Sequence, residues 1–194
     1  MNNQRTLAGV HDLELVALGR TGDRAAFGEL VRRHGSAVRA LLRRMGADGA
    51  TADDVAQDAF MAGFEQIAEF RGEGAFRTWI SRIAARSYAR RWRREARAEL
   101  LADGQDADDP QVGFGAGVGA DARIDLDDAL KSLSDPERIC VSLCYGVGLS
   151  HVEAAAALNA PLGTVKSHVK RGLDKLRSRL SPDGDGGQRR QVGG

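Results

Sequence analysis

Apolar residues recur along most of this chain at intervals of three and four, which is the spacing of amphipathic α-helices. No segment shows the sustained alternation that is typical of a strand. One helix is predicted to follow Asp23, whose carboxylate can cap it, and to end in the glycine-rich turn at 46–50. Its apolar positions are Phe27, Leu30, Val31, Val38, Leu41, Leu42 and Met45. The pattern predicts an all-α fold.

Two further helices are predicted before residue 100. Thr51 and Asp54 match a capping box, T-x-x-D, for a helix whose apolar positions are Val55, Ala59, Phe60, Phe64 and Ile67. The next helix places one face inward, made of Phe76, Ile80, Ile83, Ala84 and Ser87. Beyond Ala89 arginines occupy every side of this helix, so we expect that end to project from the core.

The helical pattern breaks at residues 102–120, which hold five glycines, one proline and four aspartates. Such a composition is typical of a flexible linker. We therefore expect two small helical domains joined by a flexible, acidic, glycine-rich linker. The expected divisions are an N-terminal segment at 1–21, a first domain at 22–97, the linker at 98–123, a second domain at 124–181 and a disordered tail at 182–194.

Start signals mark short helices in the second domain. Asp135 is expected to cap one helix, with Pro136 at its first position. Ser150 and Glu153 form a capping box for the next helix, which runs to Leu158 and is rich in small alanines.

The last helix completes the most specific pattern in the chain. Pro161 prevents the preceding helix from continuing and forces a turn. The helix that follows is expected to bury Val165, Val169, Leu173, Leu176 and Leu180. Its exposed face is expected to carry Thr164, Lys166, Ser167, His168, Lys170 and Arg171. A helix of small residues, a tight turn and a second helix with a basic face are typical of a helix-turn-helix that enters the major groove of DNA.

Charge is distributed unevenly, although the formal net charge is only +1. Residues 71–97 hold nine arginines against two acids, residues 98–128 hold nine acids against one arginine, and residues 163–180 hold six basic residues against one acid. Two basic blocks separated by an acidic one indicate a polyanionic partner.

Several other classes are not supported by the residues. The N-terminal stretch lacks the apolar core of a signal peptide, and no apolar run is long enough to span a membrane. Cys140 and Cys144 are four apart with no second pair of ligands, so we expect core residues and no metal site. There is no phosphate-binding loop and no nucleophile with a suitable base. We expect a reduced, cytoplasmic protein that is not an enzyme and needs no cofactor.

The stretch DDVAQDAFMAGFEQIAEFRGEGAFRTWISRIAARSYARRWRR resembles the second domain of the extracytoplasmic-function (ECF) sigma factors. The resemblance runs from about residue 22 to 94, and residues 126–180 resemble the fourth domain of the same family. The helix-turn-helix taken alone is equally similar to that of LuxR-type regulators, which act without core polymerase. That alternative lacks the N-terminal block, so the order of the two blocks favours a sigma factor.

The resemblance implies roles for individual residues. Asp54, Gln57 and Asp58 would bind core RNA polymerase. Thr51 stands where the family usually has an acid, which allows a phosphorylation switch beside its capping role. The −10 element would be bound and opened by Arg71, Arg77, Arg82, Arg86, Tyr88, Arg90, Trp92 and Arg93, through stacking and phosphate contacts. The −35 element would be bound by Thr164, Lys166, Ser167, His168, Lys170 and Arg171. Promoter DNA, core polymerase and an anti-sigma factor or other regulator are the implied partners.

Overall fold

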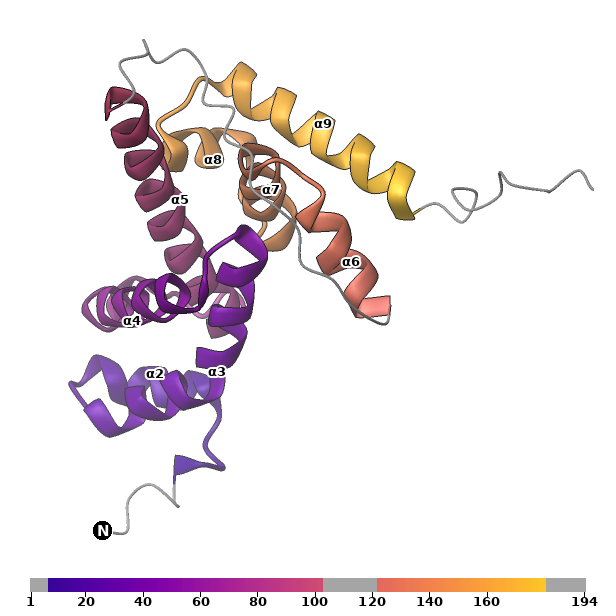
Figure 1. Cartoon of the computed structure of the whole chain (residues 1–194). Coiled ribbons are helices and arrows are strands. Elements are labelled where there is room, and N and C mark those ends of the chain that lie inside the picture. The colour runs from indigo at the N-terminus through magenta and orange to yellow at the C-terminus, as the bar shows by residue number, and fades with distance from the viewer. Residues whose placement is uncertain (1–6, 103–121, 181–194) are drawn as a thin grey trace, which may run out of the picture.

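The computed structural model describes residues 7–102 and 122–180, and within these ranges the regular structure is entirely helical. The first half contains α2 (Asp12–Arg20), α3 (Arg24–Met45), α4 (Gly49–Glu65), the 3₁₀ turn η1 (Ile67–Glu69) and α5 (Phe76–Ala102). The second half contains α6 (Ala122–Lys131), α7 (Asp135–Val141), the π-helical turn η2 (Ser142–Gly146), α8 (His151–Leu158) and α9 (Leu162–Leu180). The expected all-α fold is confirmed. Figure 1 shows the two halves and the order of their helices.

The beginnings of α3 and α4 show where local signals work and where they compete. Asp23 caps α3 as expected, because its carboxylate accepts hydrogen bonds from the backbone of Ala25 and Ala26. The expected capping box at Thr51 is wrong. Asp48 caps α4 instead, and its carboxylate accepts from the backbone N–H of Thr51 at 2.7 Å. Thr51 therefore lies inside the first turn, because an aspartate three residues earlier is the stronger cap.

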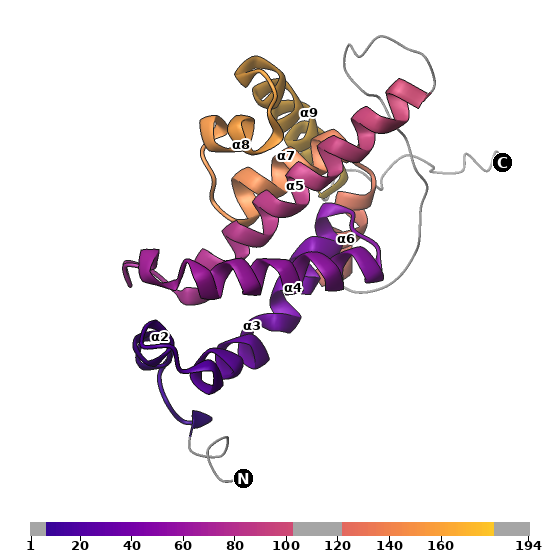
Figure 2. The same cartoon turned by 90° about the vertical axis from the view of Figure 1, so that its left-hand side faces the viewer.

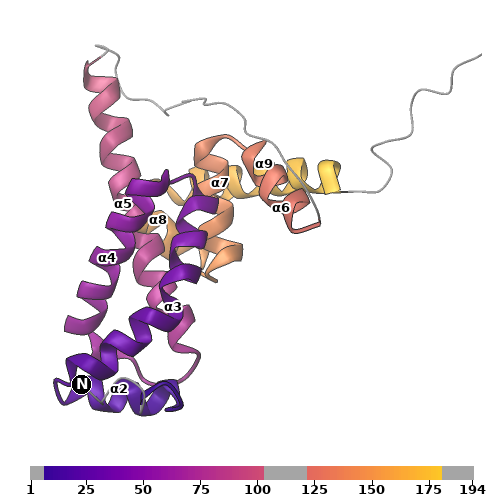
Figure 3. The same ribbon diagram turned by 60° about the horizontal axis from the view of Figure 1, so that its bottom comes forward.

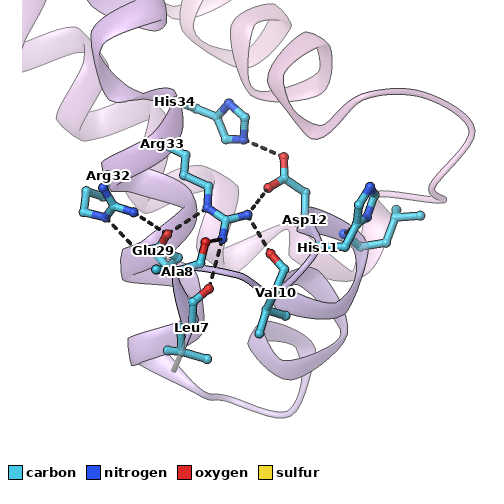
Figure 4. A network of polar contacts seen from close by, with 10 residues as sticks. Leu7, Ala8, Val10, His11, Asp12, Glu29, Arg32, Arg33 and His34 are labelled. Atoms are coloured by element: carbon cyan, nitrogen blue, oxygen red, sulfur yellow. Dashed lines mark hydrogen bonds and ion pairs between the residues drawn. The ribbon is translucent and has the colours of Figure 1, made fainter. Parts of the chain in front are cut away.

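Helix α2 lies in the N-terminal segment at 1–21, where no helix was predicted. His11 caps it through a hydrogen bond from the backbone of Leu13. Arg33 of α3 anchors the chain leading into this helix, as Figure 4 shows. Its guanidinium donates to the carbonyls of Leu7, Ala8 and Val10 and to the carboxylates of Asp12 and Glu29, at 2.7 to 3.0 Å. One arginine thus joins the start of α2 to α3.

Aromatic rings fill the core of the first half. Phe27 of α3 meets Phe60, Phe64 and Phe76 edge to face, with centroids 5.0 to 6.5 Å apart. Trp79 packs against Phe70 and Phe76 at 5.5 and 5.6 Å. Such offset contacts add to the free energy of burial itself. This core holds α3, α4 and the first turns of α5 in fixed positions.

Helices α7 and α9 form the core of the second half together with α6. Ser134 and not Asp135 caps α7, so Pro136 occupies the second helical position and the expected cap is wrong by one residue. The box at Ser150 and Glu153 is confirmed, since each backbone N–H donates to the other residue's side chain at 2.9 and 3.2 Å. Leu180 is 45% exposed, contrary to expectation, because α9 extends past α6 and α7 before it ends.

The two halves pack directly against each other. Figures 2 and 3 show α5 alongside α8, with its C-terminal end projecting beyond α3 and α4. One continuous cluster of buried apolar side chains joins Leu42 and Ala85 of the first half to Leu143 and Leu158 of the second. Helix α5 extends to Ala102, which shortens the expected linker, and the rest of that linker and the tail lie outside the described residues.

Candidate nucleic-acid interface

Helix α4 presents a polar stripe to solvent. Asp54, Gln57 and Asp58 are all exposed, while Val55 and Phe60 on the opposite face are buried. An apolar groove of about 890 Å³ runs beside the stripe between α3 and α4, and Met61 on its edge is 59% exposed. The structure therefore places the three residues together, as the spacing of α4 requires, on a surface with both polar and apolar character.

The arginines of α5 and of the loop before it fall into two groups. Arg71, Arg77 and Arg90 are exposed. Arg82 and Arg86 instead contact the second half of the chain. The Arg82 guanidinium donates to the carbonyls of Val147 and Gly148 at 3.1 and 2.9 Å. Arg86 pairs with Glu153 of α8 at 2.8 Å. Only part of the expected −10 set is therefore exposed in this arrangement.

The two aromatic candidates of α5 are less exposed than their sequence context indicated. Tyr88 is only 6% exposed, and burial raises the pKa of its phenol to about 12. The expectation that Tyr88 leaves the apolar face is wrong, because its side chain lies near Asp48 at the start of α4 and near Asp135 and Arg138 of α7. Trp92 is half-buried. Arg93, also half-buried, lines a small cavity with Trp92 against the second half.

The C-terminal part of α5 contributes arginines that were not among the expected site residues. Arg91, Arg94 and Arg97 join Arg90 and Arg93 along a groove of about 540 Å³ between α4, α5 and the end of α8. Asp58 of the polar stripe lines the same groove. The signal for these residues was present in the sequence as a run of arginines on every side of the helix. They were passed over because periodicity did not assign them to one face.

The turn between α8 and α9 has the expected geometry. Asn159 takes the left-handed conformation with φ 46°, and its backbone N–H caps α8. Pro161 precedes α9 and accepts the first helical hydrogen bond from Val165. Lys166, Ser167, Lys170 and Arg171 are exposed along α9, and Thr164 is partly exposed. These five residues form one surface at the start of the second helix.

His168 does not share that exposure. It is 8% exposed, and its Nδ1 lies 2.9 Å from the guanidinium of Arg171. The expectation that His168 is exposed is wrong, because this side of α9 faces α7 and Trp92 of α5. In this arrangement His168 contacts neighbouring side chains, and it orients Arg171.

Glu137 forms an ion pair with α9, and the sequence pattern did not predict this role. This residue of α7 is 4% exposed, pairs with Lys175 at 2.7 Å and accepts from the backbone of Ser134. Burial opposes ionisation, yet the Lys175 ammonium and the Ser134 N–H lower the pKa of the carboxyl below its ordinary value. The signal was the S-x-x-E spacing of a capping box at Ser134, hidden by the neighbouring Asp135.

The described residues were also searched for metal clusters and membrane-spanning helices. Among residues 7–102 and 122–180, no group of three or more histidine, cysteine, aspartate or glutamate side chains is arranged to hold a metal ion. Within the same ranges, no helix has the length and apolar character needed to cross a membrane.

Comparison with known proteins agrees with this geometry. Family models described as Sigma-70 region 2 and Sigma-70, region 4 match residues 30–98 and 129–178. The ECF RNA polymerase sigma factor SigE of Mycolicibacterium smegmatis is 35% identical, over 83% of this chain and 65% of that protein. The ECF RNA polymerase sigma-E factor of Escherichia coli is 31% identical, over 88% of this chain and 95% of that protein.

A solved structure extends the comparison to three dimensions. The sigma factor RpoE from Bartonella quintana, in complex with the anti-sigma factor NepR, superimposes with a TM-score of 0.51. It is 25% identical, and the match covers 81% of this chain and 98% of that chain.

The helical bundle ending in an arginine-rich helix, followed by a helix-turn-helix, defines a sigma-70 type transcription factor. Within that class, the chain belongs to the ECF group of RNA polymerase sigma factors. Sigma factors are initiation factors without enzymatic activity of their own. They bind core RNA polymerase, direct it to the −35 and −10 elements of promoters and promote melting of the DNA. The matched bundle, α3 to α5, distinguishes the chain from a LuxR-type regulator.

Proposed function

We propose that each of the three surfaces described above binds a different partner or promoter element of this sigma factor. The polar stripe of α4 (Asp54, Gln57 and Asp58) binds core polymerase, α5 with the preceding loop binds the −10 element, and α9 binds the −35 element. The observation that carries the proposal is the arrangement of α8 and α9, in which Lys166, Ser167, Lys170 and Arg171 are exposed together at the start of the second helix.

The −35 assignment is supported by the chemistry of these side chains. Arg171 and the two lysines supply cations for phosphates or guanine edges, and Thr164 and Ser167 supply hydroxyls for either. His168 acts through Arg171, which its ring contacts at 2.9 Å. Arg71 of the loop before α5 and Arg77 and Arg90 of α5 are exposed, and they bind the phosphates of the separated strand.

Transcription from a promoter with a −35 element tests the α9 assignment. Lys166→Ala and Lys170→Ala should each weaken −35-dependent initiation. A lost base contact should cost about 1–3 kcal/mol of binding free energy at one base-pair position, whereas a lost phosphate contact should lower the slope of log affinity against log salt by about one. Lys131→Ala on α6 is the control, since it removes an exposed lysine outside α9. If both α9 variants transcribe like the control, α9 does not bind the −35 element.

Co-purification with core polymerase tests the α4 assignment. Asp58→Arg should leave the fold intact, because the side chain is exposed, and should reduce binding to core. Glu14→Arg on α2 makes the same change of charge at another exposed acid and should leave binding intact. Equal binding of the two folded variants would remove the stripe from the interface.

We further propose that an anti-sigma factor regulates the chain in the cytoplasm, where core polymerase is found. The support is the Bartonella quintana RpoE structure, which holds the anti-sigma factor NepR. The apolar groove beside the α4 stripe provides a surface that a partner helix can cover. Co-expression of the cognate inhibitor should reduce both promoter-dependent transcription and the yield of the complex with core.

A further inference from the structure

The loop between η1 and α5, which belongs to the proposed −10 surface, is held from two sides. Residues 71–75 are all exposed, whereas Phe70 before them and Phe76 after them are 4% and 2% exposed. Helix α5 fixes the start of the loop, since the Phe70 ring packs on Phe76 and Trp79 with centroids 5.8 and 5.5 Å away. The contacts on the other side come from α2.

Arg20, the last residue of α2, makes the polar contact with this part of the chain. Its guanidinium donates from Nε to the carbonyl of Ile67 at 3.4 Å and from Nη2 to the carbonyl of Phe70. The Ile67 carbonyl also accepts from the backbone N–H of Phe70, so both acceptors belong to the turn that leads into the loop. A guanidinium presents its donors in a fixed planar fork. Two simultaneous hydrogen bonds therefore fix the position of the turn relative to α2.

Two apolar contacts place the turn and the loop against α2. A Cβ atom added at Gly19 would lie 2.7 Å from Cδ1 of Ile67, so the isoleucine side chain packs directly on the backbone of α2. In the loop itself, Gly72 is left-handed with φ 76°, and a Cβ atom added there would lie 3.6 Å from Cδ2 of Leu13. Helix α2 thus contacts the turn at its C-terminal end and the loop near its N-terminal end.

Helix α2 is itself fixed to α3, so it can hold the loop in one position. Arg33 of α3 binds the chain before α2 and the Asp12 carboxylate, and Nε2 of His34 lies 2.7 Å from the same carboxylate (Figure 4). On the inner face of α2, Leu15 and Val16 are 0% and 2% exposed. The helix therefore connects the core of the first half to the turn before the loop.

We propose that α2 positions the 71–75 loop for sequence-specific binding of the −10 element, with Arg20 as the positioning residue. The proposal rests on the assignment of this loop to the −10 surface. Glycine loses more conformational freedom on ordering than any other residue, and the loop contains Gly72 and Gly74. A loop that is ordered before it binds avoids this cost at the moment of binding. Arg20 acts through the loop, without touching DNA.

Arg20→Lys in the full chain separates positioning from charge. The lysine keeps the positive charge and can donate to one carbonyl, but it cannot reproduce the planar fork. Loss of one net hydrogen bond changes an equilibrium by about two- to tenfold. The preference for the favoured base at one or more −10 positions should fall by that factor. Arg43→Lys on α3 is the matched control, because it makes the same change at another exposed arginine, outside the proposed binding surfaces.

Leu13→Ala tests the same proposal without a change of charge. It removes the contact with Gly72 and should leave the fold intact, because Leu13 is 49% exposed. It should also lower the −10 preference. Leu18→Ala is its control, since it shortens another leucine of α2 that is 39% exposed and lies on another side of the helix. This pair decides the question if Arg20→Lys fails to fold.

Two measurements compare these variants with the parent chain. In the first, each holoenzyme transcribes a pool of barcoded templates with randomised −35 and −10 regions, and sequencing of the barcodes gives the base preference at every position. In the second, amide hydrogen exchange of the free chain reports opening of the turn, where the N–H groups of Glu69 and Phe70 are hydrogen-bonded. Exchange there should be about two- to tenfold faster in Arg20→Lys than in Arg43→Lys.

The outcomes separate this proposal from the proposed function. A lower −10 preference with unchanged −35 preference and unchanged binding to core, together with faster exchange of the turn, would support the positioning role. A parent-like −10 preference in folded Arg20→Lys, or in Leu13→Ala if Arg20→Lys does not fold, would overturn it. An equal loss at both promoter elements would also overturn it, because it would indicate a general loss of structure. A parent holoenzyme that selects no −10 sequence would instead refute the proposed function.

Discussion

Gly172 of α9 sits against α7 and gives a quantitative test of how the recognition helix is seated. A Cβ atom added at this position would lie 2.7 Å from Cγ2 of Val141, and the next heavy atom is 3.5 Å away. Gly172→Ala should gain about 0.5–1 kcal/mol from the lower backbone entropy of alanine in a helix. It should lose about 1–3 kcal/mol from overpacking, because the β-branched Val141 cannot rotate freely within its helix. We expect a net loss of about 1 kcal/mol in the free energy of unfolding.

Val141→Ala provides the matching perturbation. Val141 is 5% exposed, and the single variant removes two buried methyl groups. Its free energy of unfolding should fall by about 1.6 kcal/mol. In the double variant the new methyl of residue 172 meets no clash, so the total loss should be only about 1 kcal/mol. The coupling between the two sites is then about 1.6 kcal/mol.

Urea unfolding followed by far-UV circular dichroism measures all four chains of this cycle. Additivity within about 0.5 kcal/mol would refute the packing argument, since independent sites add to that accuracy. Stabilisation by Gly172→Ala with Val141 intact would refute it as well. Binding of the folded variants to a −35 duplex should stay unchanged, because Gly172 is buried away from the proposed DNA surface.

Three further predictions concern stability. Asp23→Ala should lower the free energy of unfolding by about 1 kcal/mol, measured by urea denaturation, because the α3 cap is lost, whereas Asp23→Asn should lose much less. Arg33→Lys should increase proteolysis within residues 7–12, measured by mass spectrometry, because one ammonium cannot serve five acceptors from a single position. The pKa of Glu137 is lower in the folded chain than its unfolded value of about 4.3. Its ionised carboxylate therefore stabilises the fold at pH values above about 4.3, and this contribution is lost as the pH falls through the folded pKa. Melting temperatures below pH 4.5 should thus fall less steeply in Glu137→Gln than in the parent, and equal slopes would contradict the assignment.

Local signals were most reliable where one residue had no competitor. Asp23 and the pair Ser150 and Glu153 were predicted correctly, since each is the nearest cap residue before an apolar periodic segment. Thr51 failed because Asp48 stands three positions earlier and accepts the hydrogen bond from the Thr51 backbone. Helix α2 was missed because a histidine, which is not among the preferred cap residues, starts it.

The candidate site was predictable only as far as each helix could be considered alone. The exposure of Asp54, Gln57 and Asp58 follows from the apolar face of α4, which packs within its own half. Tyr88 and His168 were predicted to be exposed, but segments distant in the sequence lie beside them. These segments are the start of α4 with α7 for Tyr88, and α5 with α7 for His168. Sequence periodicity describes a helix and one partner face. It contains no information about a second half that packs on the remaining side.

The continuous apolar cluster through both halves limits how this sigma factor can be recombined with its relatives. If residues 122–180 were exchanged for the corresponding segment of another family member, Leu42 and Ala85 would face side chains with which they had not been selected to pack. A promoter-specificity chimera joined at the linker would keep both functional regions, but the apolar side chains at the contact between its two halves would not fit one another. For this chain, the exchangeable unit is the recognition helix surface and not the whole C-terminal half.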